Sequence, residues 1–126
     1  VVIDLLRRII APYPLPTPTV SIALQVLNED SLATERRQLA MLAAERDRVT
    51  GVLADSPGIV KVWPGAANFV LVRAADGPRL VRDAAAAGIR LRDQSAQPGL
   101  ADCVRITIGT PEENNALIGF MQEWNS

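Results

Sequence analysis

The sequence contains no histidine, and its one cysteine is Cys103. These shortages exclude Ser-His-Asp and Cys-His catalysis, an internal disulfide, and zinc sites with ordinary ligand sets, so we expect no metal. No apolar run approaches the ~20 residues that span a bilayer. Asp4, Arg7 and Arg8 also interrupt the apolar start in a way that a secretory signal would not. We expect a protein of a reducing compartment, the cytoplasm, without a membrane segment.

Charge of either sign is not in excess. Thirteen Lys plus Arg against fourteen Asp plus Glu give a net charge of −1, which provides no general attraction to nucleic acid or to an anionic membrane. Lysine itself is nearly missing, because Lys61 is the only one. Schiff-base chemistry needs an amine, so this chain has little to offer it. The 126 residues are 48% hydrophobic, which suits one globular domain.

The start of the chain has a helical spacing of apolar residues but no N-cap before it. Apolar residues stand at positions 2, 5, 6, 9 and 10. A helix without its cap is what a cut through a longer chain produces, so we interpret the sequence as a fragment. Prolines then alternate through residues 11–18 and predict an extended connector, which is more simply a rigid link than a ligand for an aromatic groove.

The remaining sequence alternates between helix and strand signals. Thr110-Pro111-Glu112-Glu113 has the pattern of a capping box with proline at the first helical position. Gly88 is suited to end a helix in the left-handed conformation. The expected elements are helices at 2–10, 19 or 21 to 27, 32–54, 78–87 and from 111, and strands at 59–63, 68–73, 89–92 and 104–108. This order favours an α+β fold in which helices cover one side of a sheet of about four strands.

Arg92 and Arg105 are the candidate ligand-binding side chains. Each lies opposite the apolar residues of an alternating strand, and both can reach one anion if the two strands pair. The planar guanidinium binds carboxylate or phosphate with two hydrogen bonds and never titrates near pH 7. A solvent-facing strand also carries arginines. Arg90 shares the alternation of Arg92, so spacing alone leaves the choice between them open.

Other residues make weaker candidates. Asn68, at the start of a strand, could lie beside the site and bind a ligand, although a strand-entry turn explains it as well. Lys61 suits an edge strand, and Cys103 suits a buried, inert position. The sequence has no glycine-rich phosphate motif. No two carboxylates stand together without an arginine nearby. The sequence therefore gives little support to a hydrolase that works with a pair of acids.

Four motifs carry a resemblance to a known family. They are Ala11-Pro12-Tyr13-Pro14-Leu15 with Thr17-Pro18, Asn68-Phe69-Val70-Leu71, Ile89-Arg90-Leu91-Arg92-Asp93-Gln94, and Val104-Arg105-Ile106-Thr107-Ile108-Gly109-Thr110. In this order they resemble the C-terminal part of histidinol-phosphate aminotransferase, a pyridoxal-phosphate enzyme of the aspartate aminotransferase fold family. The resemblance covers essentially the whole chain, and the last two motifs are its most specific pieces. It implies the small domain of a fold-type I enzyme: residues 1–18 end an interdomain helix and connector, residues 19–126 form the small domain, and the large cofactor-binding domain is absent.

The resemblance also implies an activity and roles for residues. Arg105 would grip the phosphate of histidinol phosphate in one half-reaction and a carboxylate of glutamate in the other, with Arg92 as the second arginine at the phosphate end. Tyr13 would lie in the connector beside the active site. The reaction is a step of histidine biosynthesis. It moves an amino group between glutamate and imidazole-acetol phosphate, whose counterparts are 2-oxoglutarate and histidinol phosphate, and pyridoxal phosphate acts as the electron sink. The implied partners are the large domain and a second subunit in a homodimer.

The family's Schiff-base lysine lies upstream of the matching region, and Lys61 does not match its Ser-Lys motif. We therefore expect no catalytic residue in this chain and no transamination by the chain alone. Two alternatives stay open. One is the same domain of a sister enzyme, either an aminotransferase for aromatic or other amino acids or a threonine-phosphate decarboxylase. The other is a free-standing, non-catalytic α+β binding module.

Overall fold

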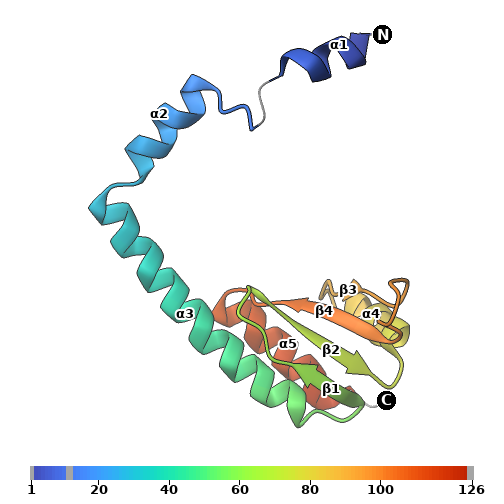
Figure 1. Ribbon diagram of the computed structural model, residues 1–126. Coiled ribbons are helices and arrows are strands. Elements are labelled where there is room, and N and C mark those ends of the chain that lie inside the picture. Colours follow the sequence, from blue (N-terminus) through green and yellow to red (C-terminus); the bar gives the residue numbers. More distant parts are fainter. Residues whose placement is uncertain (1, 11–12, 125–126) are drawn as a thin grey trace. The chain divides into compact units, whose positions relative to one another are not determined.

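The computed structural model describes residues 2–10 and 13–124. The chain divides into two compact units, Val1–Arg37 and Gln38–Ser126. Across the described residues the order of elements is three helices, two strands, a helix, two strands and a helix, which confirms the predicted order (Figure 1). The predicted domain boundary at residue 18 stays a prediction.

The first unit contains α1 (Val2–Ile9), α2 (Thr17–Val26) and the beginning of α3 (Glu29–Ala54). α2 begins at Thr17, earlier than predicted, because extended Pro16 takes the N-cap position and Pro18 falls in the first turn, where its missing N–H costs nothing. α3 also begins early, because the side chain of Asn28 accepts a hydrogen bond from the Ser31 N–H at 2.9 Å. Ala11 and Pro12 of the predicted connector lie outside the described residues.

The second unit contains a four-stranded antiparallel sheet in the order β1-β2-β4-β3. The strands are β1 (Ile59–Trp63), β2 (Phe69–Ala74), β3 (Arg92–Asp93) and β4 (Cys103–Thr107). The helices α4 (Gly77–Ala86) and α5 (Pro111–Glu123) follow β2 and β4. These elements confirm the predicted α+β class.

The strand predicted at 89–92 was wrong in extent, since pairing begins only at Arg92. Gly88 ends the turn after α4 with φ +82°, and the Ile89 N–H donates to the carbonyl of Ala84 at 2.8 Å. The Ile89 N–H is therefore engaged by the helix end and is not available to the sheet. β3 is therefore a two-residue edge strand that brings Arg92, and not Arg90, into register with β4.

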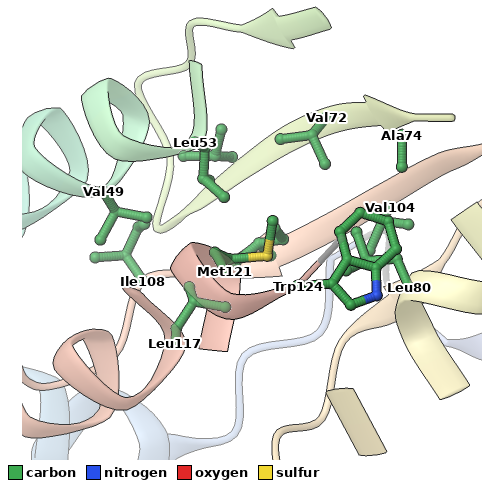
Figure 2. Close-up of a cluster of buried hydrophobic side chains, with 12 residues drawn as sticks. Val49, Leu53, Val72, Ala74, Leu80, Val104, Ile108, Leu117, Met121 and Trp124 are labelled. Carbon is green, nitrogen blue, oxygen red and sulfur yellow. The ribbon is translucent and has the colours of Figure 1, made fainter. Parts of the chain in front are cut away.

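The core lies on one face of the sheet. Alternate residues of β2 and β4 point toward the helices, as the period of two in a strand requires. α3, α4 and α5 all contribute side chains to this cluster, so the helices cover the face together (Figure 2). Its buried members are Val49, Leu53, Val70, Val72, Ala74, Leu80, Val104, Ile106, Ile108, Leu117, Met121 and Trp124. The predicted coverage on one side is confirmed.

The start of α5 is fixed by its capping box, as the sequence predicts. The hydroxyl of Thr110 accepts from the Glu113 N–H at 3.3 Å, and the Glu113 carboxylate accepts from the Thr110 N–H at 2.8 Å. At the other end of α5, the Trp124 indole donates to Asp83 of α4 at 2.9 Å. Both ends of the helix are thereby held, which sets α5 against the sheet.

Candidate functional site

The candidate site lies on the sheet face opposite the core, which we call the open face. Residues paired across antiparallel strands share a face, so the register determines its members. They combine aromatic and apolar side chains with cations and contain no carboxylate. The open face consists of Lys61, Trp63, Phe69, Leu71, Arg73, Arg92, Cys103, Arg105 and Thr107.

Arg92 and Arg105 stand directly opposite each other in the pairing of β3 with β4. Their Cβ atoms therefore lie ~4.5–5.5 Å apart on one face, close enough for both guanidinium groups to contact the same anion. Arg92 is exposed on the edge strand, whereas Arg105 is partly buried in the middle of the sheet. The two arginines predicted from alternation are thus brought together.

Neither arginine has an acidic partner within the described part of the chain. The ion pairs seen in that part of the chain include Arg46 with Asp47, Arg48 with Glu45, and Arg79 with Asp83, and these involve neither Arg92 nor Arg105. Asp93, which follows Arg92, instead accepts a hydrogen bond from the Ser95 N–H at 2.8 Å. Like charges directly opposite in a sheet are destabilising. An anion supplied from outside these residues would relieve that repulsion.

Arg105 is held by an aromatic ring. Its Cζ lies 5.3 Å from the centroid of the Phe69 ring, within the range of a cation–π contact. The Nε atom of Arg105 is buried and has no hydrogen-bond partner among the described residues. Sequence reasoning missed Phe69, because an aromatic residue on a strand predicts packing and its partner depends on the register.

The loop between β3 and β4 is fixed by Arg73, another residue of the open face. Its guanidinium donates to the carbonyls of Ala101 and Gly99, both at 3.1 Å, and also lies 5.4 Å from the Trp63 ring centroid. These hydrogen bonds tie Gly99 and Ala101, near the β4 end of the loop, to β2.

Neither Arg90 nor Asn68 belongs to the strand pairs that bring Arg92 and Arg105 together. Arg90 lines a cavity of about 340 Å³ between the Gly88–Leu91 segment, the end of β4 and α5. Asn68 is exposed, and its carbonyl accepts from the Ile108 N–H at 2.9 Å, which is the strand-entry role considered above. Tyr13 belongs to the first unit, where it is 93% exposed and has a left-handed backbone with φ +59°.

A polar cluster around the buried Asn114, next to the sheet, also escaped sequence reasoning. Asn114 of α5 donates to Glu45 of α3 at 2.8 Å and makes hydrogen bonds to both the N–H and the carbonyl of Gly109. Hydrogen bonds from the Arg48 and Asn114 side chains lower the pKa of Glu45 below its ordinary value. The cluster joins α3, α5 and the end of β4. Asn114 in the first turn of a helix gives no sequence signal of this role.

Comparison with known proteins defines the family. The family model of the class I and II aminotransferases matches residues 1–120. The chain therefore belongs to the class I and II aminotransferase family.

Curated relatives are named histidinol-phosphate aminotransferase. The chain is 42% identical over 121 residues to that of Xylella fastidiosa (strain 9a5c) and 43% identical over 120 residues to that of Xanthomonas campestris pv. campestris (strain B100). These matches cover 96% and 95% of this chain and 33% of each relative. The chain thus spans about a third of the length of the curated relatives that it matches.

Solved structures agree on the fold. The histidinol-phosphate aminotransferase from Clostridium acetobutylicum has a TM-score of 0.65 at 27% identity over 69% of this chain and 27% of its own. A decarboxylase from Sulfurospirillum multivorans has a TM-score of 0.77 at 22% identity over 95% of this chain and 35% of its own, and indicates the fold alone.

This family generally uses pyridoxal phosphate as its cofactor. The residues described do not offer a lysine placed to bind it. Lys61 is exposed on β1, where its Nζ lies 4.8 Å from the Trp63 ring centroid. β1 is an edge strand, as predicted for this lysine, and Cys103 is buried as expected. The residues described contain neither a His, Cys, Asp and Glu group suited to a metal nor a helix long and apolar enough to cross a membrane.

Proposed function

We propose that this chain is the C-terminal, substrate-gripping portion of a histidinol-phosphate aminotransferase of the cytoplasm. The longer protein would transfer an amino group between histidinol phosphate and 2-oxoglutarate, and its large domain upstream would bind the cofactor. The pairing of Arg92 with Arg105 on a face without carboxylates carries the proposal. The 42–43% identity to curated relatives of this name supports the choice of substrate.

The chemistry of the pair follows from its charges. A phosphate monoester at neutral pH carries nearly two negative charges, and two guanidinium groups can neutralise them with paired hydrogen bonds. A glutamate carboxylate in the other half-reaction would use the same donors. Arg92 and Arg105 bind and orient the substrate, and the bond-breaking chemistry belongs to the cofactor. The longer protein would act as a homodimer, as the family resemblance implies.

We expect another segment of the longer protein to supply the lysine that binds the cofactor. Lys61 is exposed and lies on β1, separated from β4 by β2. We expect the 126-residue chain to form no stoichiometric adduct with pyridoxal phosphate after borohydride reduction, as checked by mass mapping of labelled lysine. A saturable adduct at Lys61 that competes with substrate would contradict this division of roles.

The activity itself is tested with the longer protein. We expect amino transfer from histidinol phosphate to 2-oxoglutarate to exceed transfer from aromatic amino acids, and we expect the chain alone to be inactive. Greater activity with an aromatic amino acid, or carbon dioxide release from threonine phosphate, would support a sister enzyme. Turnover by the 126-residue chain alone would contradict the proposal.

A further inference from the structure

Phe69 provides the ring that contacts Arg105, the partly buried member of the arginine pair. It pairs with Thr107 of β4, which puts it diagonally across from Arg105 on the open face. Within the described part of the chain, the Arg105 guanidinium makes no hydrogen bond or ion pair, so the contact with this ring at 5.3 Å is its defining interaction. The other ring on the face, Trp63, contacts Lys61 and Arg73 instead.

The two edges of the Arg105 guanidinium differ in their access to a ligand. An anion can bind side-on, through Nε and one Nη atom, or end-on, through the two terminal Nη atoms. Nε is buried and has no partner among the described residues, so a ligand oxygen cannot reach it in this arrangement. The end-on edge is the one left for binding.

We propose that Phe69 is a positioning residue that holds the Arg105 guanidinium over its ring and presents the two Nη atoms, end-on, to the substrate anion. This inference rests on the proposed function only in taking Arg105 as an anion ligand. A free arginine side chain samples many rotamers, and ordering them on binding weakens affinity. A ring that orders the guanidinium beforehand reduces that cost, and the cation–π contact supplies the attraction.

The mode of binding is tested on the 126-residue chain by NMR of arginine side-chain N–H groups during titration with inorganic phosphate. We expect the Arg105 Hε signal to show the shift that a nearby aromatic ring causes. We expect phosphate to perturb the Arg105 Nη signals and to leave Nε nearly unchanged. A phosphate-dependent shift of Nε as large as that of Nη would overturn the end-on mode, and this result needs no variant.

The role of the ring is tested by substitution. Phe69→Leu should remove the ring-induced shift and weaken phosphate binding by about threefold to tenfold, the range of a partly desolvated cation–π contact. Phe69→Tyr keeps the ring and should restore both. The matched control is Phe120→Leu, since Phe120 is the only other phenylalanine and packs against the core from α5. Equal phosphate affinity in Phe69→Leu and the parent chain would overturn the proposal.

Kinetics of the longer protein separate this proposal from the proposed function. Phe69→Leu should raise the KM for histidinol phosphate with little change in kcat, because the ring aids binding in ground state and transition state alike. Arg105→Gln should abolish most activity. If Arg105→Gln is harmless, the proposed function fails. If Arg105→Gln is damaging and Phe69→Leu is harmless, only the role of Phe69 fails.

Discussion

Two arginines directly opposite each other in a sheet lower its stability, because like charges repel. Arg92 and Arg105 repel across the strands, and in the described residues no carboxylate compensates for either. The cost is tolerable on an exposed face, where water screens the charges. It becomes useful when a dianion binds, because the repulsion then turns into attraction for a shared ligand.

The lowered pKa of Glu45 predicts that the stability of the fold depends on pH. The Arg48 guanidinium at 2.6 Å and the Asn114 amide at 2.8 Å lower the pKa of its carboxyl below the ordinary 4.5. Because the unfolded chain then binds the proton more readily, the stabilisation is present above about pH 4.5 and is lost as the pH falls through the folded-state pKa. Glu45→Gln should lower the Tm at pH 7, and its difference from the parent chain should shrink below pH 4.5.

Thermal unfolding between pH 3 and 7 measures this effect. The control is Glu123→Gln, which changes an exposed carboxylate at the end of α5 and should leave the Tm at pH 7 nearly unchanged. A Tm difference for Glu45→Gln that is the same at both ends of the pH range would refute the account of this cluster.

The face on which a residue lies was predictable where a pattern repeats along one strand. Alternation placed Arg92 and Arg105 on the side away from the apolar residues, and the register then made them neighbours. Phe69 and Asn114 were not predictable, because their partners are 36 and 69 residues away along the chain. Such contacts depend on how β2 meets β4 and how α3 meets α5, which no local pattern encodes.

Elements were predicted well where strong local signals fix their ends. The capping box begins α5, and Gly88 ends the turn after α4 with a positive φ. The extent of β3 was predicted wrongly because the alternation of apolar and charged residues begins at Ile89, whose backbone N–H is bonded to α4, whereas pairing begins at Arg92. The alternation of apolar and charged residues indicates which face of a sheet a side chain would occupy. Hydrogen bonding decides whether the residue belongs to a strand.

Two helix glycines give a test at the scale of elements. A Cβ on Gly77, at the start of α4, would lie 2.7 Å from the carbonyl of Asp102, so Gly77→Ala should destabilise the fold by about 1–3 kcal/mol. A Cβ on Gly119, in the interior of α5, would meet no atom within 4 Å beyond the backbone of its own helix, and Gly119→Ala should stabilise by about 0.5–1 kcal/mol. Urea unfolding measures both. A neutral Gly77→Ala would mean that α4 does not approach the β3–β4 loop as described.

At the scale of the whole molecule, the exposed apolar surface of the first unit is the feature to explain. Neither α1 nor α2 buries a residue, and both expose large apolar side chains, such as Ile9 and Leu24. The relatives are about three times as long as the matched region. Both observations suit the proposal that a large domain, or a second subunit, covers these helices in the longer protein. A free-standing module would gain nothing from such exposure.

The central claim is that Arg105 grips the substrate phosphate. The most direct test compares kcat/KM for histidinol phosphate and for histidinol, which lacks the phosphate, in the longer protein and in its Arg105→Gln variant. We predict a loss of about 2–5 kcal/mol in transition-state binding with the phosphorylated substrate and a much smaller loss with histidinol. Arg90→Gln, the matched control, should leave the preference for phosphate intact. If Arg105→Gln keeps the parent's full preference for histidinol phosphate, the phosphate grip lies elsewhere and the account is contradicted.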